Sequence, residues 1–121
     1  MPTILLVEDD PDISASVAFS LIHQGYQVNA VTDGEKAVEE IFQVLPDLVI
    51  LDLMLPGMSG EEVCKMIREN HNNKIKKIPI IMLTAKSSEA DAIVGRVIGA
   101  NVYMAKPFAI DGLIQEIKKL I

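Results

Sequence analysis

The chain has 121 residues, of which 50% are hydrophobic and 23% charged, and its formal net charge is −6 at pH 7. This balance predicts one globular domain, residues 1–121, and the negative charge argues against a nucleic-acid or anionic-membrane surface. The single cysteine, Cys64, excludes an internal disulfide, and no apolar run is long enough to span a membrane, so we expect a soluble cytoplasmic domain.

The first two elements in chain order are a short apolar run and an amphipathic helix. Residues 3–7 (TILLV) are apolar and β-branched, as in strands that are buried on both faces. Asp10-Pro11 then predicts an N-cap followed by proline at the first helical position, and Gly25 predicts the end of the helix. Three apolar residues recur between them at helical spacing: Ile13, Val17 and Leu21.

The same alternation continues along the rest of the chain. Further apolar runs lie at residues 28–31, 48–51, 78–83 and 102–104. Capping-box spacing at Thr32…Glu35, Ser59…Glu62 and Ser88…Asp91 predicts helix starts, and a last helix repeats Ile110, Leu113, Ile114, Ile117 and Ile121. Residues 74–77 (KIKK) are interpreted as a solvated turn. Five strand–helix units predict one parallel sheet with helices on both faces.

Residues that directly follow the predicted strands deserve separate attention, because ligands of such sheets bind beyond the carboxyl ends of the strands. Asp10 and Asp33 have a simpler interpretation as helix caps. The others combine three carboxylates, one hydroxyl and one ammonium group at a single edge. They are Glu8 and Asp9 after the first strand, Asp52 after the third, Thr84 after the fourth and Lys106 after the fifth.

This set of groups predicts a cation site beside a phosphate site. Packed carboxylates repel one another and raise one another's pKa unless a cation joins them. Oxygen ligands suit Mg²⁺ or Mn²⁺, whose open positions commonly take phosphate oxygens. Asp52 could be a metal ligand only, or also a nucleophile that forms an aspartyl-phosphate. Lys106 and Thr84 could then meet phosphoryl oxygens.

Four segments resemble the receiver domains of bacterial two-component response regulators: LLVEDD, VILDLMLPGMSG, PIIMLTA and GANVYMAKPF. The resemblance covers essentially the whole chain, in order and spacing. It implies a flavodoxin-like (βα)5 three-layer sandwich whose five-stranded parallel sheet has the order 2-1-3-4-5. It also implies a signalling domain that catalyses only its own phosphorylation and dephosphorylation. The phosphoryl donor would be a histidine kinase or a histidine phosphotransfer protein.

The resemblance assigns a role to each residue at the predicted edge. Asp52 is expected to be the phosphoacceptor and Lys106 the phosphate-binding lysine, with a cis bond to Pro107. Thr84 is expected to move toward the phosphoryl group, and Tyr103 to turn inward after it. This switch would change the surface of the predicted fourth helix, fifth strand and fifth helix, and so control an unknown output partner or domain. The expected metal ligands are Asp9, Asp52, the backbone carbonyl of Met54 and, through water, Glu8.

Two features of the sequence depart from, or qualify, this pattern. Many transcription-factor receivers carry an acidic pair where this chain has Asn101-Val102, so a dimer held by those salt bridges is not expected. Met54 and Lys86 flank the expected path of an attacking water molecule, and both side chains are long. We therefore expect slow self-dephosphorylation.

The outward side of the first predicted helix is unusually apolar. With Ile13, Val17 and Leu21 facing inward, the outward side carries Ala15, Ala18, Phe19 and Ile22. Scattered exposed apolar residues are common, but this grouping favours a docking patch for a helix of the phosphoryl donor, near Phe19 and Ile22. We expect no direct contact with nucleic acid or membrane.

Three other functions deserve comparison with this one. A phosphohydrolase that forms an aspartyl-phosphate would need an acid two residues after the nucleophile, where this chain has Met54. A flavin or dinucleotide carrier would need a glycine-rich phosphate loop where Glu8-Asp9-Asp10 stands. A receiver-like domain that binds partners without phosphorylation is the third, and the presence of every reactive group disfavours it.

Overall fold

The computed structural model describes residues 1–84 and 99–121, so the expectations for Lys86 and for Ser88…Asp91 lie outside the described residues. Five parallel strands form one sheet in the order β2-β1-β3-β4-β5, which confirms the predicted order. The strands are β1 (Thr3–Val7), β2 (Gln27–Val31), β3 (Leu48–Asp52), β4 (Ile80–Thr84) and β5 (Val102–Ala105).

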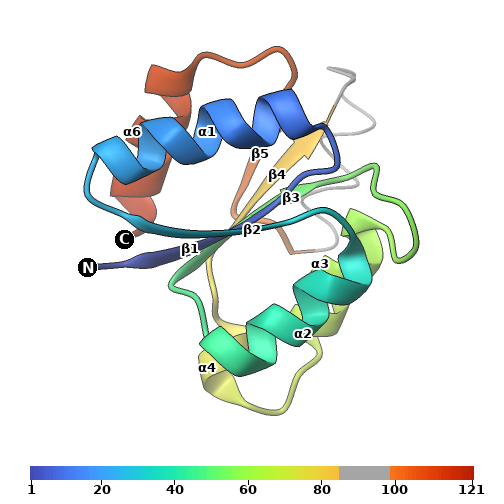
Figure 1. The fold of residues 1–121 in the computed structure, drawn as a ribbon. Helices are drawn as coiled ribbons and strands as arrows, with labels where there is room; N and C mark the ends of the chain where they lie inside the picture. The colour runs from blue at the N-terminus through green and yellow to red at the C-terminus, as the bar shows by residue number, and fades with distance from the viewer. Residues whose placement is uncertain (85–98) are drawn as a thin grey trace.

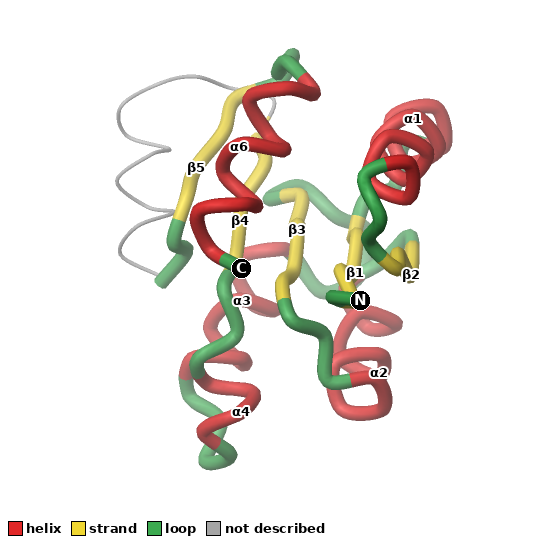
Figure 2. Tube along the Cα trace, turned by 90° about the vertical axis from the view of Figure 1, so that its left-hand side faces the viewer, coloured by secondary structure: helices red, strands yellow, loops and turns green. Residues whose placement is uncertain are grey.

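The described helices cover both faces of this sheet, which gives three layers (Figure 1). Figure 2 shows α1 and α6 together on one face, and α2, α3 and α4 on the other. Their bounds are Pro11–His23 for α1, Gly34–Val44 for α2, Gly60–Arg68 for α3, Asn73–Lys76 for α4 and Ile110–Leu120 for α6. No helix in the described ranges is long and apolar enough to cross a membrane.

The sheet separates two apolar cores, because successive side chains of a strand point to opposite faces. In β1, Ile4 and Leu6 pack with α1 and α6, while Leu5 and Val7 pack with α2 and α3. Every residue of β3 and β4 is buried, which explains why their sequences are continuously apolar. Cys64 is buried in the core that α2 and α3 cover, beside Val63 and Ile67, its apolar neighbours in the sequence.

Most predicted helix starts are confirmed by hydrogen bonds. Asp10 caps α1 by accepting from the amides of Asp12 and Ile13, at 2.9 and 3.2 Å. Ser59 and Glu62 form the predicted capping box, with Ser59 Oγ accepting from the Glu62 amide and donating to its carboxylate, both at 3.2 Å. These caps fix where α1 and α3 begin, and so where the chain leaves the sheet edge.

Asp33 is the N-cap of α2, as its interpretation as a helix cap predicts, and accepts from the Lys36 amide at 2.8 Å. The capping-box spacing that started this helix at Thr32 was wrong by one residue. The prediction for residues 74–77 was also wrong. Residues 73–76 form the short helix α4 where a solvated turn was expected. Ile75 is buried and anchors this helix, and one apolar residue among lysines is too weak a pattern to predict a helix.

Two glycines let helix starts approach the backbone of the β3–α3 loop. A Cβ atom on Gly60, the first residue of α3, would lie 2.1 Å from the carbonyl oxygen of Asp52. A Cβ atom on Gly34, the first residue of α2, would lie 2.0 Å from the carbonyl oxygen of Met58. A side chain at Gly60 would require the backbone at Asp52 to move, and one at Gly34 would require the backbone at Met58 to move.

Replacement of Gly60 by alanine should therefore lower the free energy of unfolding by about 1–3 kcal/mol, as overpacking does elsewhere. Gly112→Ala in α6 is the matched control, because the one described atom that its Cβ would meet within 4 Å is Met104 Cε, at 3.9 Å. That variant should be neutral or up to about 1 kcal/mol more stable, since alanine favours helices. Urea unfolding measures both, and equal stabilities of the two variants would contradict the close approach at Gly60.

Candidate functional site

Asp52 is the last residue of β3, paired with Leu83 of β4, and not the first residue beyond the strand as expected. Its side chain is buried, with 3% of the residue exposed. Asp52 Oδ1 accepts from the Met54 amide at 3.1 Å. The strand continues to Asp52 because Leu53 donates to the Leu83 carbonyl at 2.8 Å. The carboxylate is therefore held by the regular sheet and not by a mobile loop.

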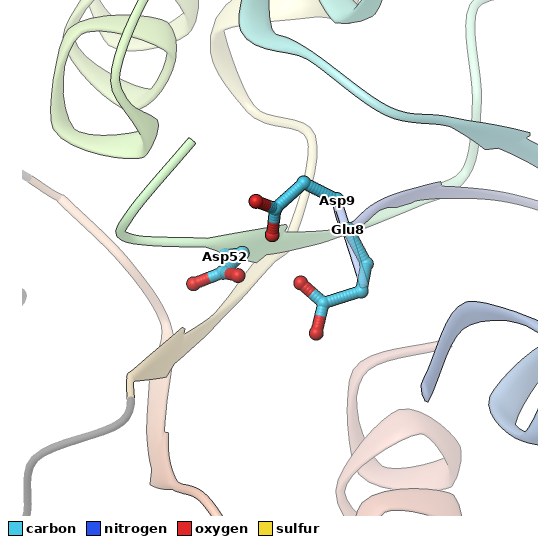
Figure 3. A group of neighbouring side chains, drawn as sticks. All are labelled: Glu8, Asp9 and Asp52. Carbon is cyan, nitrogen blue, oxygen red and sulfur yellow. The ribbon is translucent and has the colours of Figure 1, made fainter. Parts of the chain in front are cut away.

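Three carboxylates meet at this edge (Figure 3). Glu8 and Asp9 follow β1, which neighbours β3 in the sheet, and one oxygen from each acid lies within 4.8 Å of the others. Glu8 is fully buried, whereas Asp9 is exposed. Among the described residues, Glu8 Oε2 is a buried oxygen without a hydrogen-bond partner. The predicted convergence of Glu8, Asp9 and Asp52 is thus confirmed as an arrangement in space.

Lys106 brings an ammonium group into this cluster from the edge strand β5. It follows β5, and its Nζ donates to Asp52 Oδ2 at 3.0 Å and to Glu8 Oε1. The Lys106–Pro107 peptide bond is cis, as expected from the resemblance. The Lys106 amide also donates to the Thr84 carbonyl. One cation therefore joins the ends of β1, β3 and β5.

Burial and charge shift the pKa values of this cluster in definite directions. Burial, together with the nearby Asp52 carboxylate, raises the pKa of Glu8 to about 7, although Lys106 opposes this shift. Burial alone would lower the pKa of Lys106, but its contacts with Glu8 and Asp52 outweigh burial and raise it. Three carboxylates face one ammonium group here. The surplus of acidic oxygen, including the unpartnered Glu8 Oε2, makes the cluster suitable for a divalent cation.

The remaining predicted residues lie at or near the same edge. Thr84 is the buried last residue of β4, beside Ala105. Tyr103 pairs with Met82, two residues further into the sheet, and is half-buried against the core of α2 and α3. The Met54 side chain is exposed.

Sequence reasoning missed the contact between Lys106 and Glu8. Their strands, β5 and β1, are separated by β3 and β4 in the sheet, so strand adjacency does not predict it. A lysine at the end of an edge strand, with buried acids two and three strands away, is the signal that could have suggested a long side chain reaching across.

The outer side of α1 is apolar as predicted, with one correction. Phe19 is 73% and Ile22 57% exposed, and the Phe19 ring stacks on the His23 ring with centroids 6.3 Å apart. Ala18, however, packs against the core. An open cavity of about 310 Å³ lies between α1 and residues 106–110, with Lys106 in its wall.

Comparison with known proteins agrees with this fold and site. Residues 4–118 match the family model of the response regulator receiver domain, and the chain belongs to this family. The sensory transduction proteins RegX3 of Mycobacterium bovis and Mycolicibacterium smegmatis are each 40% identical over 121 residues. The matches cover 100% of this chain and 51% of each relative, so the chain spans about half the length of these curated relatives.

Solved structures of receiver proteins superpose closely on this chain. A response regulator from Chloroflexus aurantiacus is 37% identical with a TM-score of 0.92, covering 98% of this chain and 96% of its own. Chemotaxis response regulator CheY4 of Vibrio cholerae is 30% identical with a TM-score of 0.91, covering 100% and 99%. The BeF3-activated receiver domain of Klebsiella pneumoniae RstA is 32% identical with a TM-score of 0.87, covering 97% and 96%. The chain is thus similar to both a chemotaxis regulator and an activated receiver.

Replacement of Lys106 by methionine should destabilise the metal-free protein, because buried Glu8 and Asp52 lose their cation. We expect the free energy of unfolding to fall by about 2–4 kcal/mol at about pH 8. The folded-state pKa of Glu8, about 7, lies above its ordinary value of 4.5 and rises further without Lys106. As pH falls, the folded variant therefore takes up a proton before the unfolded chain does, and the deficit shrinks toward about pH 5.5.

Urea unfolding in the presence of a chelator at both pH values measures this difference. Lys119→Met is the control, because Lys119 forms only an exposed pair with Glu116 at 3.5 Å and such pairs contribute little. A deficit for Lys106→Met that is the same at both pH values would contradict the coupling to Glu8.

Proposed function

We propose that Asp52 accepts a phosphoryl group from a phosphohistidine of a histidine kinase or phosphotransfer protein. The observation that carries this proposal is the buried Asp52 carboxylate, held between the Lys106 ammonium and the acids that end β1. Membership of the receiver family supports it. The domain would act on no substrate other than its own phosphoryl group. The buried Cys64 is the single cysteine of the sequence and forms no internal disulfide, which is compatible with a reducing cytoplasm.

A divalent cation fits the acidic cluster, and we infer Mg²⁺ or Mn²⁺. Asp9, Asp52 and the backbone carbonyl of Met54 would bind it directly, and Glu8 through water. The oxygen-only donor set and the unpartnered Glu8 Oε2 support this assignment. When bound, the cation supplies neutralisation of the carboxylates and of the phosphoryl oxygens.

Groups of this chain, both side chains and a backbone amide, would carry out the transfer. One Asp52 carboxylate oxygen forms a bond to phosphorus while the bond between phosphorus and the donor's imidazole nitrogen breaks. The Met54 amide and Lys106 Nζ orient the carboxylate beforehand. Lys106 can then turn from Asp52 to a phosphoryl oxygen and offset its charge. Met54 offers no proton-transfer group beside Asp52, which disfavours a phosphohydrolase.

Thr84 and Tyr103 would transmit phosphorylation of Asp52 to the surface of the domain. The phosphoryl group would draw the Thr84 hydroxyl toward it, and Tyr103 would turn inward into the space that Thr84 leaves. Both residues lie on the neighbouring strands β4 and β5, which supports this coupling. The altered surface would comprise β5, α6 and the helix expected after β4, which lies outside the described residues. An output partner or domain would bind there.

We place donor docking on the outer side of α1. Phe19 and Ile22 offer an exposed apolar surface for a helix of the donor. The cavity between α1 and residues 106–110 is lined by Ser16 and Val17 of the same helix and by Lys106. A donor side chain in this cavity would bring the phosphohistidine close to Asp52.

Incubation with Mg²⁺ and a small acyl phosphate should add the mass of one phosphoryl group to the protein. The adduct should be acid-stable and base-labile, as an acyl phosphate is. It should be absent from Asp52→Asn and after removal of the metal with a chelator, because both remove groups that the transfer requires. Mass spectrometry of intact protein measures it. An adduct that persists in Asp52→Asn would move the acceptor elsewhere, and rapid turnover without an adduct would instead support a phosphohydrolase.

Replacement of Phe19 by glutamate should slow phosphotransfer from the cognate donor by about tenfold or more, since a charge would enter the apolar contact. Phe42→Glu is the matched control, because Phe42 is also an exposed phenylalanine, 50% exposed, but lies on α2. Both variants should react normally with the small acyl phosphate. Equal phosphotransfer to the two variants would remove α1 as the docking site.

A further inference from the structure

The guanidinium group of Arg68, in the last turn of α3, connects this helix to two other segments of the chain, residues 76–78 and residues 99–101. Nε donates to the Gly99 carbonyl at 2.9 Å, and Nη1 to the carbonyls of Lys76 and Ile78 at 2.8 and 2.7 Å. Nη2 donates to Asn101 Oδ1 at 2.8 Å. Within residues 1–84 and 99–121, no carboxylate forms an ion pair with Arg68. Its charge is therefore stabilised by carbonyl and amide dipoles.

Asn101 connects this cluster to the sheet immediately before β5. The side-chain oxygen Oδ1 of Asn101 also accepts from the backbone amide of Ile80 at 2.8 Å. The backbone amide of Asn101 donates to the Ile80 carbonyl, also at 2.8 Å. These bonds add one rung to the β4–β5 ladder, ahead of the first strand pair, Ile81 with Val102. Arg68 thus holds the side chain that fixes the start of β5.

β5 is short and lies at an edge of the sheet, so such an anchor affects its position. It has four residues, all half-buried, and it forms an edge of the sheet. Because β4 and β5 are parallel, no tight turn sets their register. A slip of one residue would move the chain by about 3.3 Å and turn Tyr103 to the opposite face. The 3.0 Å contact between Lys106 Nζ and Asp52 Oδ2 would then be lost.

We propose that Arg68 and Asn101 are positioning residues that hold the register of β5, and thereby deliver Lys106 to Asp52. This inference rests on the proposed role of Lys106. Gly99 contributes by letting the arginine lie against the backbone: its φ is 101°, and a Cβ there would lie 2.8 Å from Arg68 Cγ.

The first test is amide hydrogen exchange by NMR in Arg68→Met. The amides of Asn101 and Lys106 report on the start and end of β5, since they donate to Ile80 and Thr84. Their exchange should accelerate by about tenfold or more relative to the exchange of the Glu8 amide. The Glu8 amide donates to Val31 of β2, the edge strand opposite β5. Acceleration of all three amides to the same extent, or of none, would overturn the proposal.

The second test asks whether Arg68 acts through Lys106. The initial rate of phosphorylation by a small acyl phosphate with Mg²⁺ is measured in the wild type, Arg68→Met, Lys106→Arg and the double variant. Arg68→Met should lower the rate about tenfold when Lys106 is present, but less than about twofold in the Lys106→Arg background. An equal loss in both backgrounds would show a general structural effect and overturn the proposal.

Two further variants keep these tests decisive. Asn101→Ala removes the shared acceptor Oδ1 without removing the guanidinium group, and should reproduce both effects if Arg68→Met fails to fold. Lys65→Met is the matched control, because Lys65 is an exposed cation on the same helix, and should change neither measurement. If the wild type forms no phosphoryl adduct, the proposed function fails, and the exchange experiment alone then decides whether Arg68 holds β5.

Discussion

The ammonium group of Lys106 is the interaction on which the site depends. It reaches two buried carboxylates, Glu8 and Asp52, which come from different strands and would otherwise repel each other. Removing a partner from such a buried set leaves an uncompensated charge, which costs far more than the loss of a surface ion pair. The arrangement suits the proposed acceptor role of Asp52, because a cation already shared between acids can be redirected to a phosphoryl oxygen.

The regular sheet supplies the precision that this arrangement needs. Asp52 remains within the ladder, so its carboxylate is positioned by strand pairing and by the Met54 amide. The loop that follows is packed closely against the starts of α2 and α3, where only glycine fits. The Asp52 carboxylate is therefore held rigidly on one side, while the side facing solvent is bordered by the exposed acid Asp9.

Strand order, layers and the gathering of acids could be predicted because each depends on strong patterns: continuous apolar strands, capping residues and charged residues directly after strands. The misses have local causes. α4 depends on one buried residue, Ile75, which no periodicity reveals. Asp52 remains in the strand because its partner strand extends equally far, which composition cannot show. The contact of Lys106 with Glu8 depends on the reach and rotamer of a long side chain, and the hydrogen bonds of Arg68 depend on carbonyls that have no signature in sequence.

The division of the interior by the sheet has a consequence for how such a domain can diverge. α1 shares its apolar core with α6, whereas α3 shares the other core with α2 and α4. Substitutions on the solvent side of α1 therefore need no compensating change beneath α3, and the reverse also holds. Surface replacements on α1 can therefore change the face that this helix presents to solvent without disturbing the packing that supports the β3–α3 loop.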